Sequence, residues 1–386
     1  MGLTFDEIKS GFDAEWEQRG EVRSADEIPM GWDLVTPEWM TDVLTGGNGD
    51  ARVVSLRPGE PDEGTASRRR IFIEYNDAGK AAGLPPRVFC KSTHRLENRF
   101  IIGMNGGIEA EVSFFNTVLP ELDVEAPKCY FANFNPRTLN SIIVMKDMAD
   151  EVEFCSDAVE LTEAHARNQM ELLARLHSAY YQSDALTTKL SAWNNWEDYF
   201  AITAREAGFE DACQRGFAQA KEVIPPALFA REAEIWPATV ASIALHAKLP
   251  RMLVHSDVHL KNWYIVGPGK MGLNDWQCSC KGHWSRDLSY ALSTCLSVEQ
   301  RREWERGLLR HYLDCMRAAG VPEIAFDDAL LAYRRQMFGA LAWWTGTLGQ
   351  PPEAPAMQPP ETSLKFIGRM TRAMDDLDSL GALKDA

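Results

Sequence analysis

Apolar and polar positions alternate in short runs along the first half of the chain, which is the pattern of strands with one buried face. Turn-rich segments with Gly, Pro, Asp and Asn separate most of these runs. Strands are expected at residues 52–57, 70–75, 87–92, 128–133 and 141–145. Residues 108–119, between the third and fourth runs, have apolar side chains at helical spacing instead. The pattern therefore predicts a five-stranded sheet with a helix inserted between two of its strands.

In the second half of the chain, from Leu161 onwards, apolar residues recur every three or four positions, as they do on the buried face of a helix. Helices are expected at residues 169–178, 194–207, 231–247, 297–319, 326–348 and 363–380. The predicted class is α+β, with a small N-terminal lobe that holds an antiparallel sheet and a larger, mainly helical C-terminal lobe. We place a helical extension at 1–35, the N-terminal lobe at 36–146 and the C-terminal lobe at 147–386.

Charge and composition exclude several classes of partner. The 386 residues include 40 Lys and Arg against 56 Asp and Glu, a formal net charge of −16 at pH 7. Nucleic acids and anionic membranes attract clustered cations, so neither is an expected partner. No run of eighteen apolar residues and no apolar leader occurs, and we expect a cytoplasmic protein. The eight cysteines are scattered and are expected to be reduced thiols.

One segment inside the helical half carries candidate chemistry. Residues 253–287 read LVHSDVHLKNWYIVGPGKMGLNDWQCSCKGHWSRD. Asp257 precedes Asn262 by five residues, and Asp275 follows a short apolar run and a Gly-Pro-Gly turn. Phosphoryl transfer from a nucleotide requires one carboxylate to accept the proton of the attacking hydroxyl, and oxygen ligands to hold Mg²⁺ on the phosphates. We therefore expect Asp257 to be the catalytic base, and Asn262 and Asp275 to bind Mg²⁺.

The first half of the chain offers the residues that a nucleotide would need. The order of the three residues above is that of the kinase catalytic loop and the following D-F-G aspartate, and the two-lobe layout is that of a protein-kinase-like fold. Lys91 ends the third strand, where the V-A-I-K lysine contacts the phosphates of ATP. Glu111 is the better partner for Lys91 because it precedes the buried Phe114 and Phe115 by about one turn, and Glu109 remains an alternative. Gly64 lies in the turn between the first two strands, which covers the phosphates in kinases.

At these residues the chain resembles the aminoglycoside phosphotransferase superfamily, close to its choline-kinase-like and ecdysteroid-kinase-like branches. The similar segments are LVHSDVHLKNW, LNDWQ, HWSRDLSY, LLARLHSAYY, VFCKS and EAEVSFFNTVLP, and the resemblance spans residues 36–380. It implies an ATP- and Mg²⁺-dependent transfer of a phosphoryl group to a hydroxyl of a small molecule.

The chain departs from this family at a few positions. Ser256 stands where the family commonly has glycine, and Trp276 and Gln277 replace the last two residues of D-F-G, which argues against a protein kinase. Lys146 stands where an acidic hinge residue is common, so backbone groups near Met145 are expected to bind adenine. No catalytic atom is lost through these changes.

Aromatic residues indicate the chemical class of the molecule that accepts the phosphoryl group. Trp284 and the pair Trp343–Trp344 lie in segments that line the acceptor site in this family's architecture, and His259 is open between substrate contact and simple packing. Such a pocket suits a hydrophobic alcohol, for example a steroid or terpenoid alcohol or a hydroxyacyl thioester. One alternative is an aminoglycoside O-phosphotransferase, since the acidic charge suits a polycation. A second alternative is a catalytically silent nucleotide-binding protein. The presence of Asp257, Asn262 and Asp275 disfavours it.

Overall fold

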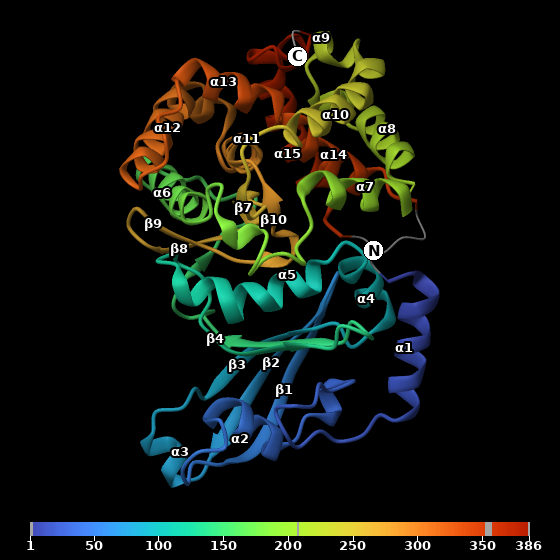
Figure 1. The fold of residues 1–386 in the computed structure, drawn as a ribbon, viewed down its shortest axis with the longest axis vertical. Coiled ribbons are helices and arrows are strands. Elements are labelled where there is room, and N and C mark those ends of the chain that lie inside the picture. Colours follow the sequence, from blue (N-terminus) through green and yellow to red (C-terminus); the bar gives the residue numbers. More distant parts are fainter. Residues whose placement is uncertain (1–2, 207, 352–356, 385–386) are drawn as a thin grey trace. The chain divides into compact units, whose positions relative to one another are not determined.

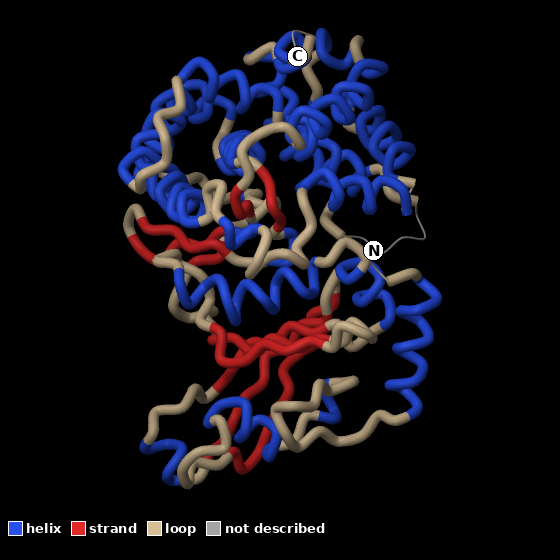
Figure 2. The backbone as a smooth tube through the Cα atoms, viewed as in Figure 1, coloured by secondary structure: helices blue, strands red, loops and turns tan. Residues whose placement is uncertain are grey.

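The computed structural model describes residues 3–206, 208–351 and 357–384. The chain forms two compact units, which comprise Met1–Glu121 with Pro127–Asp150, and Leu122–Ala126 with Glu151–Ala386. A five-stranded antiparallel sheet lies in the first unit and most of the second unit is helical, as Figures 1 and 2 show. The predicted α+β class is confirmed.

The sheet of the first unit has the strand order β1-β2-β3-β5-β4, and each neighbouring pair is antiparallel. Its strands are β1 (Val53–Glu63), β2 (Ser67–Tyr75), β3 (Arg87–Ser92), β4 (Cys129–Phe134) and β5 (Ser141–Lys146). β1 and β2 extend beyond the predicted runs because polar residues continue the ladder, as where Asp62 pairs with Arg68 at 2.9 Å. Alternation of apolar residues locates the buried part of a strand and misses its solvated end.

Several helices of the first unit contact the sheet. The unit contains α1 (Phe5–Glu17), α2 (Pro37–Thr45), α3 (Asp77–Ala81), α4 (Leu96–Gly103) and α5 (Gly107–Ser113), and α5 continues into a π-helical turn at Phe114–Val118. Thr36 caps α2 by accepting a hydrogen bond from the Trp39 N–H at 3.1 Å. Trp39 packs in one cluster with Val88 and Cys90 of β3. Since strand side chains alternate between faces, Lys91 lies on the other face from Cys90.

The second unit is built mainly from helices. They are α6 (Glu163–Ala179), α7 (Trp196–Glu206), α8 (Phe209–Gln219), α9 (Pro226–Phe229), α10 (Glu232–His246), α11 (Trp284–Cys295), α12 (Val298–Ala318), α13 (Phe326–Arg335), α14 (Met337–Leu348), α15 (Pro360–Asp376) and α16 (Ser379–Ala382). The single helix expected at 326–348 is wrong, because the chain turns at Gln336, whose side chain bonds His246 and the carbonyl of Ser242. The expected helix at 194–207 ends one residue beyond α7, and residue 207 lies outside the described residues.

Close packing of α8 on α14 depends on glycine. A Cβ atom on Gly216 of α8 would lie 1.9 Å from the carbonyl oxygen of Thr345 on α14, so no larger residue fits there without a shift of the backbone. The sequence pattern did not predict α8.

Short strands of the second unit frame the segment that carries the candidate chemistry. β7 (Met252–Val254) pairs with β10 (Cys280–Gly282), and β6 (Glu153–Phe154), β8 (Trp263–Gly267) and β9 (Lys270–Leu273) form a three-stranded sheet in the order β6-β8-β9. The apolar run and Gly-Pro-Gly turn seen in the sequence are thus the β8–β9 hairpin. Among the described residues, no helix is long and apolar enough to cross a bilayer.

Candidate functional site

Asp257 lies in the loop that follows β7, and three side chains surround its carboxylate. Asn262 donates from Nδ2 to the backbone carbonyl of Asp257 at 2.7 Å and to its Oδ2 at 3.1 Å. The Tyr290 hydroxyl donates to Oδ1 at 3.0 Å, and Nε2 of His259 lies 3.6 Å from Oδ2. The Asp257 side chain keeps 19% of its surface exposed. The loop therefore brings Asp257 and Asn262 together and leaves part of the carboxylate open to a ligand.

The surroundings keep this carboxylate ionised. Burial raises the pKa of Asp257, but the imidazoles of His259 and His255 and the Tyr290 hydroxyl together lower that pKa by more, so the net shift is downward. An ionised carboxylate with a low pKa is a weak base, and it accepts a hydrogen bond from a hydroxyl readily. Orientation of the attacking group matters more than strong basicity in the loose transition state of phosphoryl transfer.

Asp275 is the second residue beyond β9, and hydrogen bonds join this point of the chain to the Asp257 loop. The neighbouring Asn274 donates from its N–H to the carbonyl of Asn262 at 2.9 Å, and its own carbonyl lies 2.9 Å from Nε2 of His255. Asp275 is half-buried and adopts a left-handed backbone with φ of 62°. Asp is one of the few residues besides Gly that reach this conformation at low cost.

The donor set fits a magnesium ion. Nδ2 of Asn262 is engaged by Asp257, so the amide oxygen is the ligand atom that Asn262 offers, and Asp275 adds carboxylate oxygens. Hard oxygen ligands suit Mg²⁺, which takes only one or two protein ligands and completes its shell with phosphate and water. In the described ranges, no group of three His, Cys, Asp or Glu side chains is close enough to hold a metal ion.

Asp287, near the start of α11, stabilises the backbone of the Asp257 loop. Its side chain is completely buried and accepts hydrogen bonds from the N–H groups of His255 and Ser256, both at 2.8 Å, while Nε2 of His177 lies 3.1 Å away. Burial raises the pKa of Asp287, yet His177 and these donors lower it below the usual value. Asp287 thus has a structural role, since it bonds the backbone of the loop that holds Asp257.

The backbone conformation of Ser256 explains why glycine is common at this position in the family that the chain resembles. Its φ is 69°, in the left-handed region where glycine carries no steric cost. Here the serine hydroxyl gains a partner, since Arg286 donates from Nε to Oγ at 2.8 Å and from Nη2 to the Ser256 carbonyl at 2.9 Å. The guanidinium lies 3.5 Å from the ring centroid of Trp196. The hydrogen bonds of the side chain offset the backbone strain.

Lys91 and Glu111 form a buried ion pair in the first unit. Nζ of Lys91 lies 2.8 Å from both carboxylate oxygens of Glu111, and the two side chains are 11% and 7% exposed. Lys91 extends from the face of β3 that is opposite Cys90, and Glu111 extends from α5. Of the two glutamates considered, Glu111 is the partner of Lys91.

Gly64 and Met145, which are also expected to contact the nucleotide, lie in a turn and in a strand of the sheet of the first unit. Gly64 lies in the β1–β2 turn, where its N–H donates to the carbonyl of Ala66 at 3.0 Å and its carbonyl accepts from Asn98 at 3.2 Å. Met145 lies near the end of β5, is buried, and pairs with Phe89 of β3. Both remain predictions as nucleotide contacts.

The residues expected at the acceptor lie in different surroundings. His259 contacts Trp344 edge-on, with ring centroids 5.2 Å apart, beside the Asp257 carboxylate. Trp284 is only 1% exposed, and its ring packs 5.4 Å from that of Tyr312. A ring enclosed in this way contacts protein atoms, so we assign Trp284 to the core and not to the acceptor pocket.

Trp343 belongs to an aromatic cluster. Its ring lies 4.9 Å from Phe209, 5.6 Å from Trp196, 5.7 Å from Phe200 and 6.1 Å from Tyr199. Trp196 connects the cluster to the catalytic segment, because it packs under the guanidinium that bonds the backbone next to Asp257. The cluster is apolar and partly accessible at Trp343.

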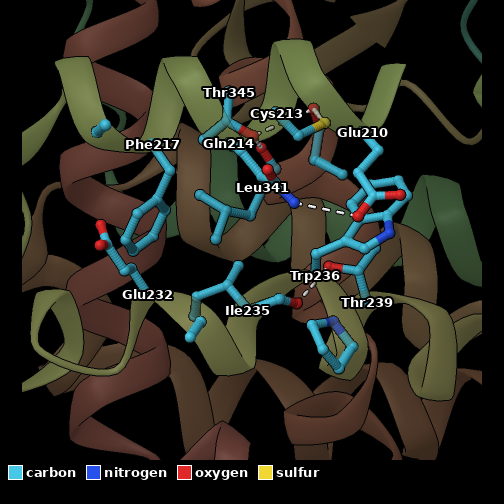
Figure 3. A pocket seen from close by; sticks show the side chains of 14 residues that line it. Glu210, Cys213, Gln214, Phe217, Glu232, Ile235, Trp236, Thr239, Leu341 and Thr345 are labelled. Atoms are coloured by element: carbon cyan, nitrogen blue, oxygen red, sulfur yellow. Dashed lines mark hydrogen bonds between the residues drawn. The ribbon is translucent and has the colours of Figure 1, made fainter. Parts of the chain in front are cut away.

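A separate pocket of about 510 Å³ lies between α8, α10 and α14 (Figure 3). Phe217, Trp236 and Leu341 supply apolar lining, while the polar Thr239 and Cys213 already donate to backbone carbonyls. Within the described part of the chain, the residues that line it include none of the predicted site residues. The residues expected to take part in phosphoryl transfer therefore lie outside this pocket.

Sequence reasoning missed Tyr290 and the contact it makes with Trp344. Tyr290 follows Asp287 by three residues on α11, so the helical spacing places both side chains on one face toward the same loop. That spacing was available in the sequence. Nε1 of Trp344 donates to the Tyr290 hydroxyl at 2.8 Å, and its place at an acceptor wall stays a prediction.

Comparisons with known proteins agree with this geometry. Residues 151–326 match the model of the phosphotransferase enzyme family. No curated protein sequence matches the chain significantly.

Solved structures resemble the chain in fold. A candidate aminoglycoside phosphotransferase from Ralstonia eutropha JMP134 is 16% identical, with coverage of 90% of this chain and 97% of its own and a TM-score of 0.50. Ethanolamine kinase of Plasmodium vivax is 12% identical, with coverage of 84% and 83% and a TM-score of 0.45. Spectinomycin phosphotransferase, solved with ADP and spectinomycin, is 12% identical, with coverage of 85% and 94% and a TM-score of 0.47.

At such identities the likeness concerns the fold alone. The family match is independent of it and covers the segment that holds Asp257, Asn262 and Asp275. The resemblance to the aminoglycoside phosphotransferase superfamily is thus confirmed, and residues 151–326 carry the features of the phosphotransferase enzyme family.

Proposed function

We propose that this protein is an ATP- and Mg²⁺-dependent phosphotransferase that moves the γ-phosphate of ATP to a hydroxyl group of a small molecule. The observation that carries the proposal is the state of Asp257. Its carboxylate is ionised, oriented by Asn262 and Tyr290, and 19% exposed, in a loop whose backbone Asp287 stabilises. A carboxylate that the protein orients and that stays partly accessible can accept a hydrogen bond from a bound hydroxyl.

In the proposed reaction, Asp257 accepts a hydrogen bond from the acceptor hydroxyl and then its proton. The hydroxyl oxygen forms a bond to the γ-phosphorus as the bond to the β–γ bridging oxygen breaks, and ADP leaves with that electron pair. Asn262 and Asp275 would hold Mg²⁺, which neutralises charge on the phosphate oxygens when bound. These roles use the side-chain oxygens of Asn262 in the loop and of Asp275 beyond β9.

The first unit would bind the nucleotide. Lys91 would contact phosphate oxygens, and Glu111 orients its ammonium group. The β1–β2 turn that holds Gly64 would cover the phosphates, and backbone groups near Met145 would bind adenine.

For the acceptor we propose a hydrophobic alcohol. The aromatic cluster around Trp343 supports this class, because it lies next to the catalytic segment through Trp196 and presents apolar surface. His259, beside the Asp257 carboxylate, would contact the acceptor near its hydroxyl.

A coupled ADP-release assay with Mg-ATP tests the proposal. The acceptor panel would contain sterols, terpenols, hydroxyacyl thioesters, choline and aminoglycosides, each with a control in EDTA. We expect EDTA-sensitive ADP release with an apolar alcohol. Turnover of aminoglycosides alone would keep the chemistry and overturn the acceptor class. Absence of any Mg²⁺-dependent nucleotide binding in a thermal-shift assay would overturn the function and favour a silent nucleotide-binding relative.

A further inference from the structure

A hydrogen-bond chain leads from α14 through α11 to the Asp257 carboxylate. Nε1 of Trp344 donates to the Tyr290 hydroxyl at 2.8 Å, and that hydroxyl donates to Oδ1 of Asp257 at 3.0 Å. Tyr290 is 1% and Trp344 3% exposed, so water does not compete for these bonds. Both rings are also held by packing, since Trp344 lies 4.7 Å from Phe366.

The chemistry of the three groups gives the chain one direction. An indole N–H can only donate, and an ionised carboxylate can only accept. The Tyr290 oxygen must therefore accept from Trp344, and its single proton must go to Asp257. The hydroxyl has no second orientation that satisfies both neighbours, so the Asp257 carboxylate always receives this bond on the same oxygen.

The position of Tyr290 on α11 adds to its effect. Asp287, three residues earlier on the same helix, bonds the backbone of His255 and Ser256, and Tyr290 bonds the side chain of the next residue. One face of α11 therefore holds both the backbone of the loop and the rotamer of its carboxylate.

We propose that Tyr290 is a positioning residue for phosphoryl transfer, and that Trp344 acts through it by setting the direction of its hydroxyl. The inference rests on the proposed function of Asp257. A carboxylate has about four lone-pair sites. Tyr290 occupies one on Oδ1 and Asn262 one on Oδ2, so the partly exposed carboxylate keeps sites with which it can accept from an acceptor hydroxyl.

A double-mutant cycle tests the proposal. Tyr290→Phe removes the hydroxyl and keeps the ring, and we expect kcat to fall about 10- to 100-fold through misplacement of the carboxylate. KM for ATP should stay within about twofold, because the nucleotide contacts lie elsewhere. Trp344→Phe should cause a smaller loss of kcat. The double variant should match Tyr290→Phe alone, because Trp344 acts only through the hydroxyl that is already gone.

Tyr333→Phe is the matched control. Tyr333 is equally buried and its hydroxyl lies 3.5 Å from Glu305, outside the Asp257 network, so its removal should leave kcat at the parental value. Parental kcat in Tyr290→Phe, or losses from Tyr290→Phe and Trp344→Phe that multiply in the double variant, would overturn the proposal.

Crystal structures of the variants give a readout that does not need activity. We expect the Asp257 carboxylate to turn, or to take several orientations, in Tyr290→Phe and to stay unchanged in Tyr333→Phe. An unchanged carboxylate in Tyr290→Phe would overturn the positioning role. If the parent transfers no phosphate to any acceptor, the proposed function fails, and the crystal structures still decide whether Tyr290 orients Asp257.

Discussion

Asp257 belongs to the loop after β7 and Asp287 bonds the backbone of that loop, and the surroundings of these two ionised aspartates differ. Asp287 is completely buried and accepts bonds from two backbone N–H groups and lies 3.1 Å from the ring of His177. Asp257 is bonded by the side chains of Asn262 and Tyr290, and it keeps 19% of its surface exposed. Burial and desolvation oppose the charge of both, and hydrogen bonds or nearby imidazoles restore it.

The difference separates a structural carboxylate from a reactive one. A buried carboxylate whose lone pairs all meet protein donors stabilises the fold and has no capacity left for a substrate. A carboxylate that is oriented by the protein and still accessible has such capacity. The comparison predicts that loss of Asp287 is seen in stability and loss of Asp257 in turnover.

Asp287→Ala should have the largest effect on stability. The change leaves the N–H groups of His255 and Ser256 and the ring of His177 without their buried acceptor, which costs about 3–5 kcal/mol. Urea unfolding followed by tryptophan fluorescence measures the loss, and Asp287→Asn gives a second variant if the first does not fold. An unfolding curve like that of the parent would remove the distinction between the two aspartates.

Lys91→Met extends the comparison to the first unit. There Lys91 forms a buried ion pair with Glu111 and is expected to contact the nucleotide as well. Loss of the ammonium group removes a charged contact to phosphate, so KM for ATP should rise about tenfold or more, equivalent to at least ~1.4 kcal/mol. Lys80→Met is the control, since Lys80 is exposed on α3. Equal KM values in the two variants would contradict the role of Lys91.

Acid should destabilise the second unit before either aspartate is protonated. Burial lowers the pKa of His246 to about 3, although the contact with the Gln336 amide oxygen at 2.7 Å raises it. The neutral ring accepts from the His283 N–H at 2.9 Å. The unfolded chain binds a proton on this histidine near pH 6.5 and the folded chain does not. The contribution of the neutral His246 ring to the free energy of unfolding is therefore present above pH 6.5. It falls as the pH drops toward 3, by about 2 kcal/mol between pH 6.5 and 5.

Unfolding free energies measured across that pH range test the effect. His246→Asn should show a shallower dependence of stability on pH than the parent. If the free energy of unfolding depends on pH with the same slope in both proteins, groups other than His246 cause the loss of stability in acid.

Ser256→Gly should have the smallest effect. Glycine relieves left-handed strain of about 1 kcal/mol, but it removes the hydroxyl that accepts from Arg286, a charge-assisted bond that contributes about 1.5–3 kcal/mol. The free energy of unfolding should fall by about 1 kcal/mol while kcat changes little. A more stable glycine variant would show that the Arg286 bond adds less than the strain it offsets.

Local patterns in the sequence predicted the parts of the site that depend on spacing. Asn262 follows Asp257 by five positions, which is close enough to place the amide against the carboxylate within one short loop. Helical periodicity singled out Glu111 over Glu109 by its place one turn before the buried aromatic residues.

Other features depend on contacts between distant elements and were not predictable in this way. Tyr290 and Trp344 meet only because α11 and α14 pack together, and a single sequence gives no register for that packing. Gln336 breaks the helix predicted at 326–348 through bonds to α10, although glutamine is a good helix former. Trp284 is enclosed by Tyr312, which comes from α12.

The most direct test of the account is a comparison of Asp257→Asn with the parent in the ADP-release assay and in thermal melting. Asparagine keeps the shape of the side chain and loses the capacity to accept a proton. The account predicts that turnover falls by at least about a thousandfold, ~4 kcal/mol in the activation barrier, while the melting temperature stays close to that of the parent. Parental turnover, or a loss of stability as large as that of Asp287→Ala, would contradict it.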